Sequence, residues 1–246
     1  MVRILDMPVS EGQKEELITI WQESFGDDRA YIERFIKKNA SYMKVVVCEE
    51  NERILSVAYL LPISYVGNNE TTQECYYLYA AATHLNERGH GYFSQILQFV
   101  NERIEQPVIL VPASKELADY YKRYGYNVWL EEQTSMLGNV DFDLAKEVDS
   151  ETYFNYRNDC LRMPGSMLWG YEMIAYISEE HIAAGGKFMI VSFQNEKLLV
   201  MALPEKDTYK LVEVLCNNKA FRMTPIVLSN KVLEVQGEAY FNLSMG

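Results

Sequence analysis

The first half of the chain alternates helical and strand-like patterns of apolar residues. Leu17, Trp21 and Phe25 recur every four residues and predict a first helix with one apolar face. A second, more polar helix is expected from about Asp28 to Lys38. Strand-like runs follow in three places, at residues 44–48, 54–66 and 73–83. This alternation favours a mixed sheet covered by helices, in an α+β fold.

A glycine-containing break at Asn86–Gly91 separates the third strand from another predicted helix. That helix is apolar at positions i, i+3, i+4, i+7 and i+11, which are Phe93, Ile96, Leu97, Val100 and Ile104. A short buried strand at 107–112 leads into a further helix, which Gly125 closes as a left-handed cap. The further helix carries one stripe made of Leu117, Tyr120, Tyr121 and Tyr124. We place the end of a first domain, residues 1–138, after this segment.

The remaining residues, 139–246, predict a smaller α+β domain. Pro164 and Gly165 mark a helix boundary there. One helix is expected to carry Trp169, Met173, Tyr176 and Ile177 at i, i+4, i+7 and i+8. Strand runs follow at 187–193, 197–203, 209–215 and 239–243. Helices followed by a meander repeat the order of the first half, so an incomplete second copy of the same fold is one interpretation of this domain.

Composition and charge narrow the classes of partner. The chain is 48% hydrophobic and 24% charged, which is ordinary for a globular protein. Its net charge of −12 argues against nucleic acid or an anionic membrane as partner and favours a neutral or cationic substrate. Asp6 interrupts any signal-peptide core, no run reaches the length of a membrane span, and the four cysteines form no CxxC pair. We therefore expect a cytoplasmic protein with reduced, structural cysteines.

The segment Arg88–Phe93 carries the strongest chemical pattern. A helix that starts directly after a strand has unpaired backbone N–H groups, and glycines let a phosphate approach them. A glycine turn of this kind is also common as a purely structural feature. The chain contains no GxxxxGK[ST] loop, and the segment 107–112 lacks the acidic residue of a dinucleotide-binding fingerprint. The pattern therefore favours another kind of pyrophosphate site.

Two segments together resemble a known family. The run Leu78–Tyr92 resembles the acyl-CoA signature of the GNAT superfamily of N-acetyltransferases. Arg88, Gly89 and Gly91 match the turn Arg-Gly-x-Gly-x-Gly, and Phe93 stands at its third glycine. Downstream, Ser114–Tyr126 is similar to the family's helix ending in Tyr-x-x-x-Gly-Phe. The resemblance covers about residues 1–135. The rest looks loosely like the second domain of the enhanced-intracellular-survival acetyltransferases, whose chains end in a strand similar to Ala239–Leu243.

The resemblance implies acetyl-CoA as co-substrate and assigns residues to its binding. It implies that the backbone of Ala81, Ala82 and Thr83 pairs with the pantetheine arm. The residues expected to hold the pyrophosphate and the rest of CoA are Arg88, Gly89, His90, Gly91, Tyr92, Phe93 and Ser114. The acceptor would be a small-molecule or peptide amine. Whether the protein forms a homo-oligomer is left open.

The catalytic assignments rest on family position. Tyr121 occupies the position of the general acid that protonates the CoA thiolate, or belongs only to its apolar stripe. Glu74 is a candidate base or a solvated carboxylate at a strand end, and the terminal carboxylate of Gly246 is another candidate base. No metal is implied, because His84 and His90 lack a metal-ligand spacing.

The absence of a GxSxG motif favours direct transfer within a ternary complex over an acyl-enzyme. The aromatic-rich helices at 153–156 and 169–177 are expected either to line an acceptor pocket or to pack in the hydrophobic core. The alternatives to an enzyme are a non-catalytic acyl-CoA sensor and a protein-interaction role for the second domain.

Overall fold

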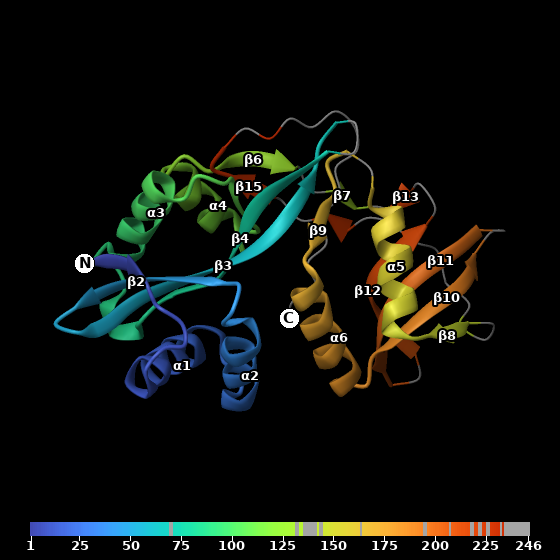
Figure 1. The fold of residues 1–246 in the computed structure, drawn as a ribbon, viewed down its shortest axis with the longest axis horizontal. Coiled ribbons are helices and arrows are strands. Elements are labelled where there is room, and N and C mark those ends of the chain that lie inside the picture. Colours follow the sequence, from blue (N-terminus) through green and yellow to red (C-terminus); the bar gives the residue numbers. More distant parts are fainter. Residues whose placement is uncertain are drawn as a thin grey trace. The chain divides into compact units, whose positions relative to one another are not determined.

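The structure is a computed structural model with two compact units (Figure 1). It describes residues 1–68, 71–130, 133–134, 142, 145–162, 164–193, 196–206, 208–216, 219–220, 223–224, 227–231 and 233. Unit 1 comprises Met1–Ile63, Glu74–Trp129 and Leu228–Leu233, and unit 2 comprises Ser64–Gln73, Leu130–Val227 and Glu234–Gly246. The predicted strand Ala239–Leu243 and the candidate base Gly246 lie outside the described residues. The division at residue 138 stays a prediction.

Unit 1 is built on a mixed sheet with the strand order β1-β2-β3-β4-β5-β15-β6. The strands are β1 (Val2–Ile4), β2 (Lys44–Glu50), β3 (Arg53–Val66), β4 (Thr72–Thr83), β5 (Val108–Leu110), β6 (Asn127–Leu130) and β15 (Val227–Ser229). β4 and β5 run parallel, whereas β1–β2, β2–β3 and β5–β15 are antiparallel pairs. The predicted mixed sheet and its central meander are confirmed.

Four α-helices and one short 3-10 helix complete unit 1. They are α1 (Glu11–Phe25), α2 (Arg29–Asn39), η2 (Leu85–Glu87), α3 (Tyr92–Arg103) and α4 (Lys115–Lys122). In Figure 1, α1 and α2 lie below the sheet and α3 lies above it. Ser10 and Gln13 form a capping box at the start of α1, and Gly26 ends the helix in the left-handed conformation. These local caps set the limits of α1.

An aromatic core joins α1 and α2 to the central strands. The Trp21 ring has the Phe35, Tyr59 and Tyr79 rings around it, with centroids 4.9, 5.1 and 5.7 Å away. Leu17 and Trp21 are buried as predicted. The prediction for Phe25 was wrong, because this side chain is 48% exposed at the last residue of α1. There the helix ends, and the Phe25 ring only meets Trp21 edge-on at 6.0 Å.

β15 completes the sheet of unit 1 from near the other end of the chain. It inserts between β5 and β6, and Leu228 and Ser229 face Leu110 and Ile109 in the β5 register. Val227 and Leu228 are fully buried. Asn230 adds two bonds to Val108, from its backbone N–H to the carbonyl at 3.1 Å and from the Val108 N–H to Oδ1 at 2.8 Å. The sequence did not predict this strand.

Within its described residues, unit 2 contains an antiparallel sheet and two helices. Its strand order is β13-β12-β11-β10-β8, and a separate ribbon pairs β7 with β14. The elements are β7 (Gln133–Thr134), β8 (Lys146–Val148), α5 (Ser150–Cys160), β9 (Met167–Trp169), α6 (Tyr171–Ala183), β10 (Lys187–Phe193), β11 (Glu196–Glu205), β12 (Thr208–Cys216), β13 (Lys219–Ala220) and β14 (Met223–Thr224). The predicted strand runs 187–193, 197–203 and 209–215 are confirmed. Whether unit 2 is a copy of the first fold stays a prediction.

One helix prediction in unit 2 was wrong. Trp169 does not share a helix with Met173 and Tyr176, because it ends the short strand β9, while α6 begins at Tyr171 after its N-cap Gly170. The spacing of the apolar residues continued across the junction between β9 and α6. None of the described helices is long and apolar enough to span a membrane.

Candidate active site

In the described part of the sheet, β4 and β5 are paired near the middle of β4. The register pairs Tyr76 with Val108 and Tyr77 with Ile109, and β4 then runs on to Thr83. Within β4, Ala80 has a φ of 44°, which costs a non-glycine residue roughly 1–2 kcal/mol. On its other edge the end of β4 is tied to β3, since the Ser56 hydroxyl donates to the Ala82 carbonyl at 2.9 Å. The end of β4 therefore has one edge, in the described part of the sheet, that β5 does not cover.

A glycine turn follows directly at the end of β4. Gly89 and Gly91 both have a φ of 83°, which favours glycine strongly. A Cβ built on either glycine would meet no atom within 4 Å, so both backbones face open space. Gly91 is the N-cap of α3 and supplies no side-chain cap. The first N–H groups of α3 therefore point to a space that an anionic ligand can enter, which is the arrangement of a phosphate site.

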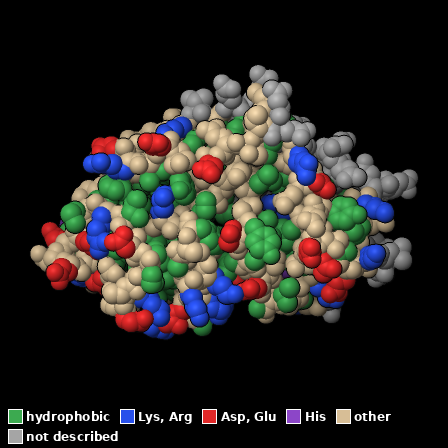
Figure 2. All heavy atoms as spheres, viewed as in Figure 1, with side chains coloured by type: hydrophobic (Ala, Val, Ile, Leu, Met, Phe, Trp, Pro, Cys, Tyr) green, Lys and Arg blue, Asp and Glu red, His purple; other side chains and the backbone are tan. Residues whose placement is uncertain are grey.

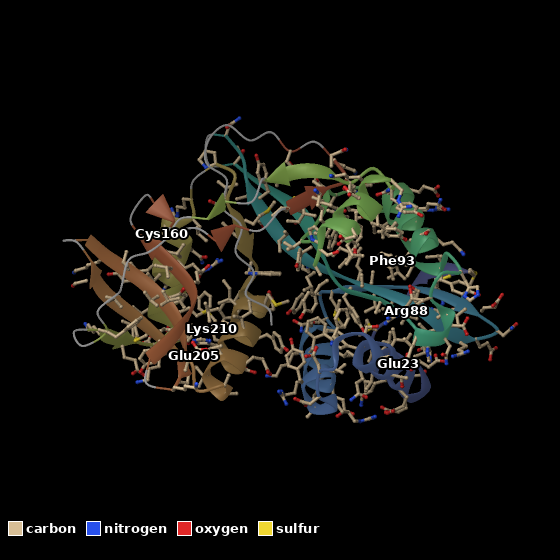
Figure 3. The ribbon with its side chains drawn as sticks, turned by 180° about the vertical axis from the view of Figure 1, so that it is seen from behind. Glu23, Arg88, Phe93, Cys160, Glu205 and Lys210 are labelled. Carbon is tan, nitrogen blue, oxygen red and sulfur yellow. The ribbon has the colours of Figure 1, made fainter. Side chains whose placement is uncertain are left out.

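The end of α1 holds this turn in place. The Arg88 guanidinium donates from Nε to the Thr83 carbonyl at 3.2 Å and from Nη2 to Ser24 Oγ at 3.0 Å. Glu23 Oε2 accepts from the Leu85 N–H at 2.9 Å and lies 2.9 Å from His84 Nδ1. Figure 3 labels Glu23, Arg88 and Phe93 in this region. The Arg88 side chain thus braces the turn and leaves anion binding to the backbone.

Sequence reasoning missed Glu23 and Ser24. Both lie more than sixty positions before their partners in the turn, as the separations of 62 and 64 show. No spacing rule connects residues that far apart.

The side chains of two further residues of the turn, His90 and Tyr92, have contacts with other side chains of the protein. His90 is exposed, and its ring centroid lies 6.1 Å from that of Tyr92. The Tyr92 hydroxyl donates to Glu50 Oε2 at 3.3 Å. Both residues can contribute backbone groups to a ligand, and a role for their side chains stays a prediction.

Tyr121 lies against the first turn of α3. It is buried, at 8% exposure, and its ring meets the Phe93 ring edge-on at 6.1 Å and an interplanar angle of 86°. Burial raises the pKa of Tyr121 above the usual value, and the neighbouring Tyr120 and Tyr77 add to the shift. The phenol therefore keeps its proton at neutral pH. The structure brings Tyr121 and Phe93 together, although they come from different helices.

The start of α4 corrects one prediction and leaves another open. Ser114 is the N-cap of α4, where its Oγ accepts from the Leu117 N–H at 3.2 Å. This explains the serine by the helix alone, and its contact with CoA stays a prediction. Leu117 is 42% exposed, so its place on a buried stripe was wrong. It lies in the first turn of a short helix, whose buried side is formed by Ala118 and Tyr121.

The candidate base Glu74 is not joined to Tyr121 by any contact between described residues. Glu74 is exposed and forms no hydrogen bond or ion pair with another described residue. Tyr77 is one of the residues that raise the pKa of Tyr121. It lies three residues after Glu74 on β4, and side chains alternate between the two faces of a strand. The side chain of Tyr77 therefore lies on the opposite face of β4 from that of Glu74. The role of Glu74 stays a prediction. Within the described ranges, no group of three His, Cys, Asp or Glu side chains is arranged to hold a metal ion.

Comparisons with known proteins agree with this geometry. Residues 7–129 match the sequence model of a family described as "Acetyltransferase (GNAT) domain". A search of curated proteins finds no match to the chain. The matched segment contains strands β4 and β5, the glycine turn and Tyr121.

Solved structures share the fold at low sequence identity. A probable N-acyltransferase from Enterococcus faecalis is 17% identical, with a TM-score of 0.65 over 90% of this chain and 60% of its own. Eis1 from Mycobacterium abscessus is 12% identical, with a TM-score of 0.63 over 91% and 61%. A GCN5-related N-acetyltransferase from Kribbella flavida is 14% identical, with a TM-score of 0.59 over 88% and 57%. The chain thus spans about three fifths of the length of each.

The matched segment, residues 7–129, is a domain of the GNAT acetyltransferase type. The chain belongs to the GNAT acetyltransferase family.

Proposed function

We propose that the protein is an N-acetyltransferase that moves the acetyl group of acetyl-CoA directly to a primary amine within a ternary complex. The observation that carries the proposal is the open glycine turn that follows β4, a strand that runs on beyond its pairing with β5. Gly89 and Gly91 leave a space that a side chain would fill, beside N–H groups at the start of α3 that no side chain caps. Pyrophosphate is a group that such a helix start binds well.

The extended part of CoA fits the neighbouring strand end. We assign the uncovered edge of β4 at Ala81, Ala82 and Thr83 to the pantetheine arm, whose amides can pair there as an added strand would. N–H groups from Arg88 to Phe93 would hold the pyrophosphate. When bound, acetyl-CoA supplies the thioester. The residues of this chain orient it and supply a proton.

Tyr121 is the proposed general acid. The amine nitrogen forms a bond to the acetyl carbon, the carbon–sulfur bond breaks, and the thiolate takes the phenolic proton. Because burial keeps the Tyr121 pKa above its usual value, the proton is present throughout the neutral range. The phenol is restored when a proton returns from solvent. Its neighbours Phe93 and Tyr120 keep the ring beside the first turn of α3.

The acceptor must lose a proton as well. A lysine-like ammonium with a pKa of about 10.4 requires roughly 4–5 kcal/mol to deprotonate at pH 7 without help. Glu74 and the terminal carboxylate of Gly246 are the proposed candidates for the base. The net charge of −12 supports a cationic or neutral acceptor, a small molecule or a peptide. On the face shown in Figure 2, acidic side chains lie among the basic ones. The described residues on that face therefore present no extended basic surface of the kind that binds nucleic acid.

Two measurements test the proposal together. Isothermal titration with acetyl-CoA tests the glycine turn, and a panel of amines assayed for CoA release tests transfer. Saturable binding with amine-dependent thiol release is expected. Binding with no release by any amine would favour an acyl-CoA sensor, and the absence of binding would refute the assignment of the turn.

A further inference from the structure

Ser94, in the first turn of α3, is bonded to two tyrosine hydroxyls of the α4 segment. Tyr124 Oη donates to Ser94 Oγ at 2.7 Å, and Tyr120 Oη lies 3.0 Å from the same oxygen. A serine hydroxyl has one hydrogen to donate and two acceptor positions, so it can bond both phenols at once. The two tyrosines flank Tyr121 in the sequence. Ser94 therefore connects α3 to the residues on both sides of the proposed acid.

A second bond fixes the end of the same segment. Asn101 lies seven positions after Ser94 on α3, which places both side chains on one face of the helix. Its Nδ2 donates to the Tyr124 carbonyl at 2.7 Å, and its Oδ1 accepts from Asn230 Nδ2 at 3.0 Å. The Phe93 ring stacks on Tyr120, with centroids 6.2 Å apart and an angle of 19°. Polar bonds and ring contacts thus hold α4 along α3.

Tyr121 itself is surrounded by rings. Its centroid lies 5.8 Å from Tyr120, 5.9 Å from Tyr126 and 6.1 Å from Phe93. Ring contacts of this kind are weakly directional compared with hydrogen bonds. The position of the phenolic oxygen therefore depends on where α4 sits against α3.

We propose that Ser94 is a positioning residue for Tyr121, because its hydroxyl fixes α4 to the first turn of α3 and so sets the distance between the acid and the glycine turn. This inference rests on the proposed function of Tyr121 as general acid. A proton donor has to come within about 2.6–3.2 Å of its acceptor, and a misplacement of about 1 Å can reduce the rate by roughly 100-fold. A hydroxyl that never touches the substrate can thereby control kcat.

The test compares Ser94→Ala with Tyr124→Phe, which removes the donor of the 2.7 Å bond and keeps the ring. For Ser94→Ala we expect kcat to fall about tenfold, a part of the 10²–10⁴-fold typical of general acid catalysis. We expect KM for acetyl-CoA and its calorimetric Kd to change by less than about twofold, since the backbone N–H groups remain. Tyr124→Phe should lower kcat in the same direction. The matched control is Gln98→Ala, on an exposed position of the same helix, which should leave both parameters unchanged.

A double-mutant cycle shows whether Ser94 acts through Tyr121. If it does, Ser94→Ala should change kcat by less than about twofold in a Tyr121→Phe background. The same tenfold loss in both backgrounds would overturn the proposal, as would an unchanged kcat in the single variant. A large loss of acetyl-CoA affinity would also overturn it, because Ser94 would then belong to the phosphate site.

Hydrogen–deuterium exchange gives a readout that does not require turnover. The amides of α4 should exchange faster in Ser94→Ala than in the wild type or in Gln98→Ala, because the helix has lost its anchor. Unchanged exchange in α4 would refute the positioning role even if no amine is acetylated. A wild-type protein that releases no CoA with any amine, yet shows the exchange difference, would refute the proposed function and leave the anchor in place.

Discussion

The edge of the Phe93 ring meets the Tyr121 ring at 6.1 Å and 86°, so the residue at the third position of the glycine turn touches the proposed acid. A glycine at this position has no side chain that can make such a contact. Phe93 is half-buried, and its ring also stacks on the ring of Tyr120. Its ring is thus directed to α4. The departure from the glycine pattern therefore links the glycine turn to α4.

Replacing Phe93 should reduce turnover more than binding. In Phe93→Ala the edge contact to Tyr121 is lost, and we expect kcat to fall by roughly tenfold because the acid is less well placed. The affinity for acetyl-CoA should stay the same or improve, because the turn gains room. Truncating a half-buried ring should also destabilise the protein by about 1–3 kcal/mol. Steady-state kinetics, calorimetry and urea unfolding measure the three effects.

Phe25→Ala is the matched control for this prediction, since the Phe25 ring is exposed at the end of α1. It should leave kcat within about twofold of the wild type. Loss of acetyl-CoA affinity in Phe93→Ala with kcat unchanged would contradict the prediction and show that the ring contacts the ligand.

A side chain at Gly91 should block acetyl-CoA. Gly91→Ala introduces a Cβ at a φ of 83°, so strain should lower the free energy of unfolding by about 1–2 kcal/mol. The Cβ meets no protein atom within 4 Å, so it projects where we place the pyrophosphate. We expect affinity to drop by more than roughly tenfold, since one lost phosphate contact of about 1.4 kcal/mol suffices. Isothermal titration measures the change.

Gly185→Ala separates strain from obstruction. Gly185 has a φ of 78°, and a Cβ there would only touch Pro204 at an ordinary 3.5 Å. This variant should be destabilised to a similar degree and bind acetyl-CoA normally. Equal affinity in the two alanine variants would argue that no ligand occupies the space at Gly91.

Buried tyrosines with raised pKa values should make the protein sensitive to alkaline pH. Burial raises the pKa of each phenol above its usual value of about 10 at Tyr59, Tyr77, Tyr121 and Tyr126. Between pH 10 and these raised values the unfolded chain loses phenolic protons that the folded protein keeps. Unfolding is then favoured, so these phenols should leave stability unchanged below about pH 10 and lower it above that pH.

Urea unfolding at several pH values, followed by tyrosinate absorbance, measures this dependence. Tyr121→Phe removes one of the four phenols and should make the alkaline loss of stability less steep. A folded protein in which all tyrosines titrate together near pH 10 would contradict the prediction, because it would show that the phenols are not buried.

Local patterns predicted the parts of the site that a short segment encodes. The glycine turn and the apolar face of α3 depend on neighbours in the sequence, and their residues were found by spacing. The brace between Arg88 and Ser24 and the bond between Ser94 and Tyr124 join separate elements, so no period reveals them. Trp169 shows the opposite failure, because a helical spacing ran across the junction between the strand β9 and the helix α6.

β15 was unpredictable for a related reason. It has three residues, too few for a recognisable alternation, and its partner β5 lies more than a hundred positions earlier. Short strands that complete a distant sheet owe their stability to burial in that sheet.

The last prediction concerns this strand. A fragment of residues 1–138 contains the family segment but lacks β15, so β5 and β6 would lose the strand between them and the buried Val227 and Leu228. We expect the fragment to show no cooperative unfolding and no acetyl-CoA binding.

In the full chain, Asn230→Ala removes an acceptor from the Val108 N–H and should destabilise the protein by about 1–3 kcal/mol. Circular dichroism and urea unfolding test both changes, with Asn86→Ala, an exposed asparagine, as control. A fragment that folds and binds acetyl-CoA would show that the first 138 residues form a complete domain and that β15 is dispensable.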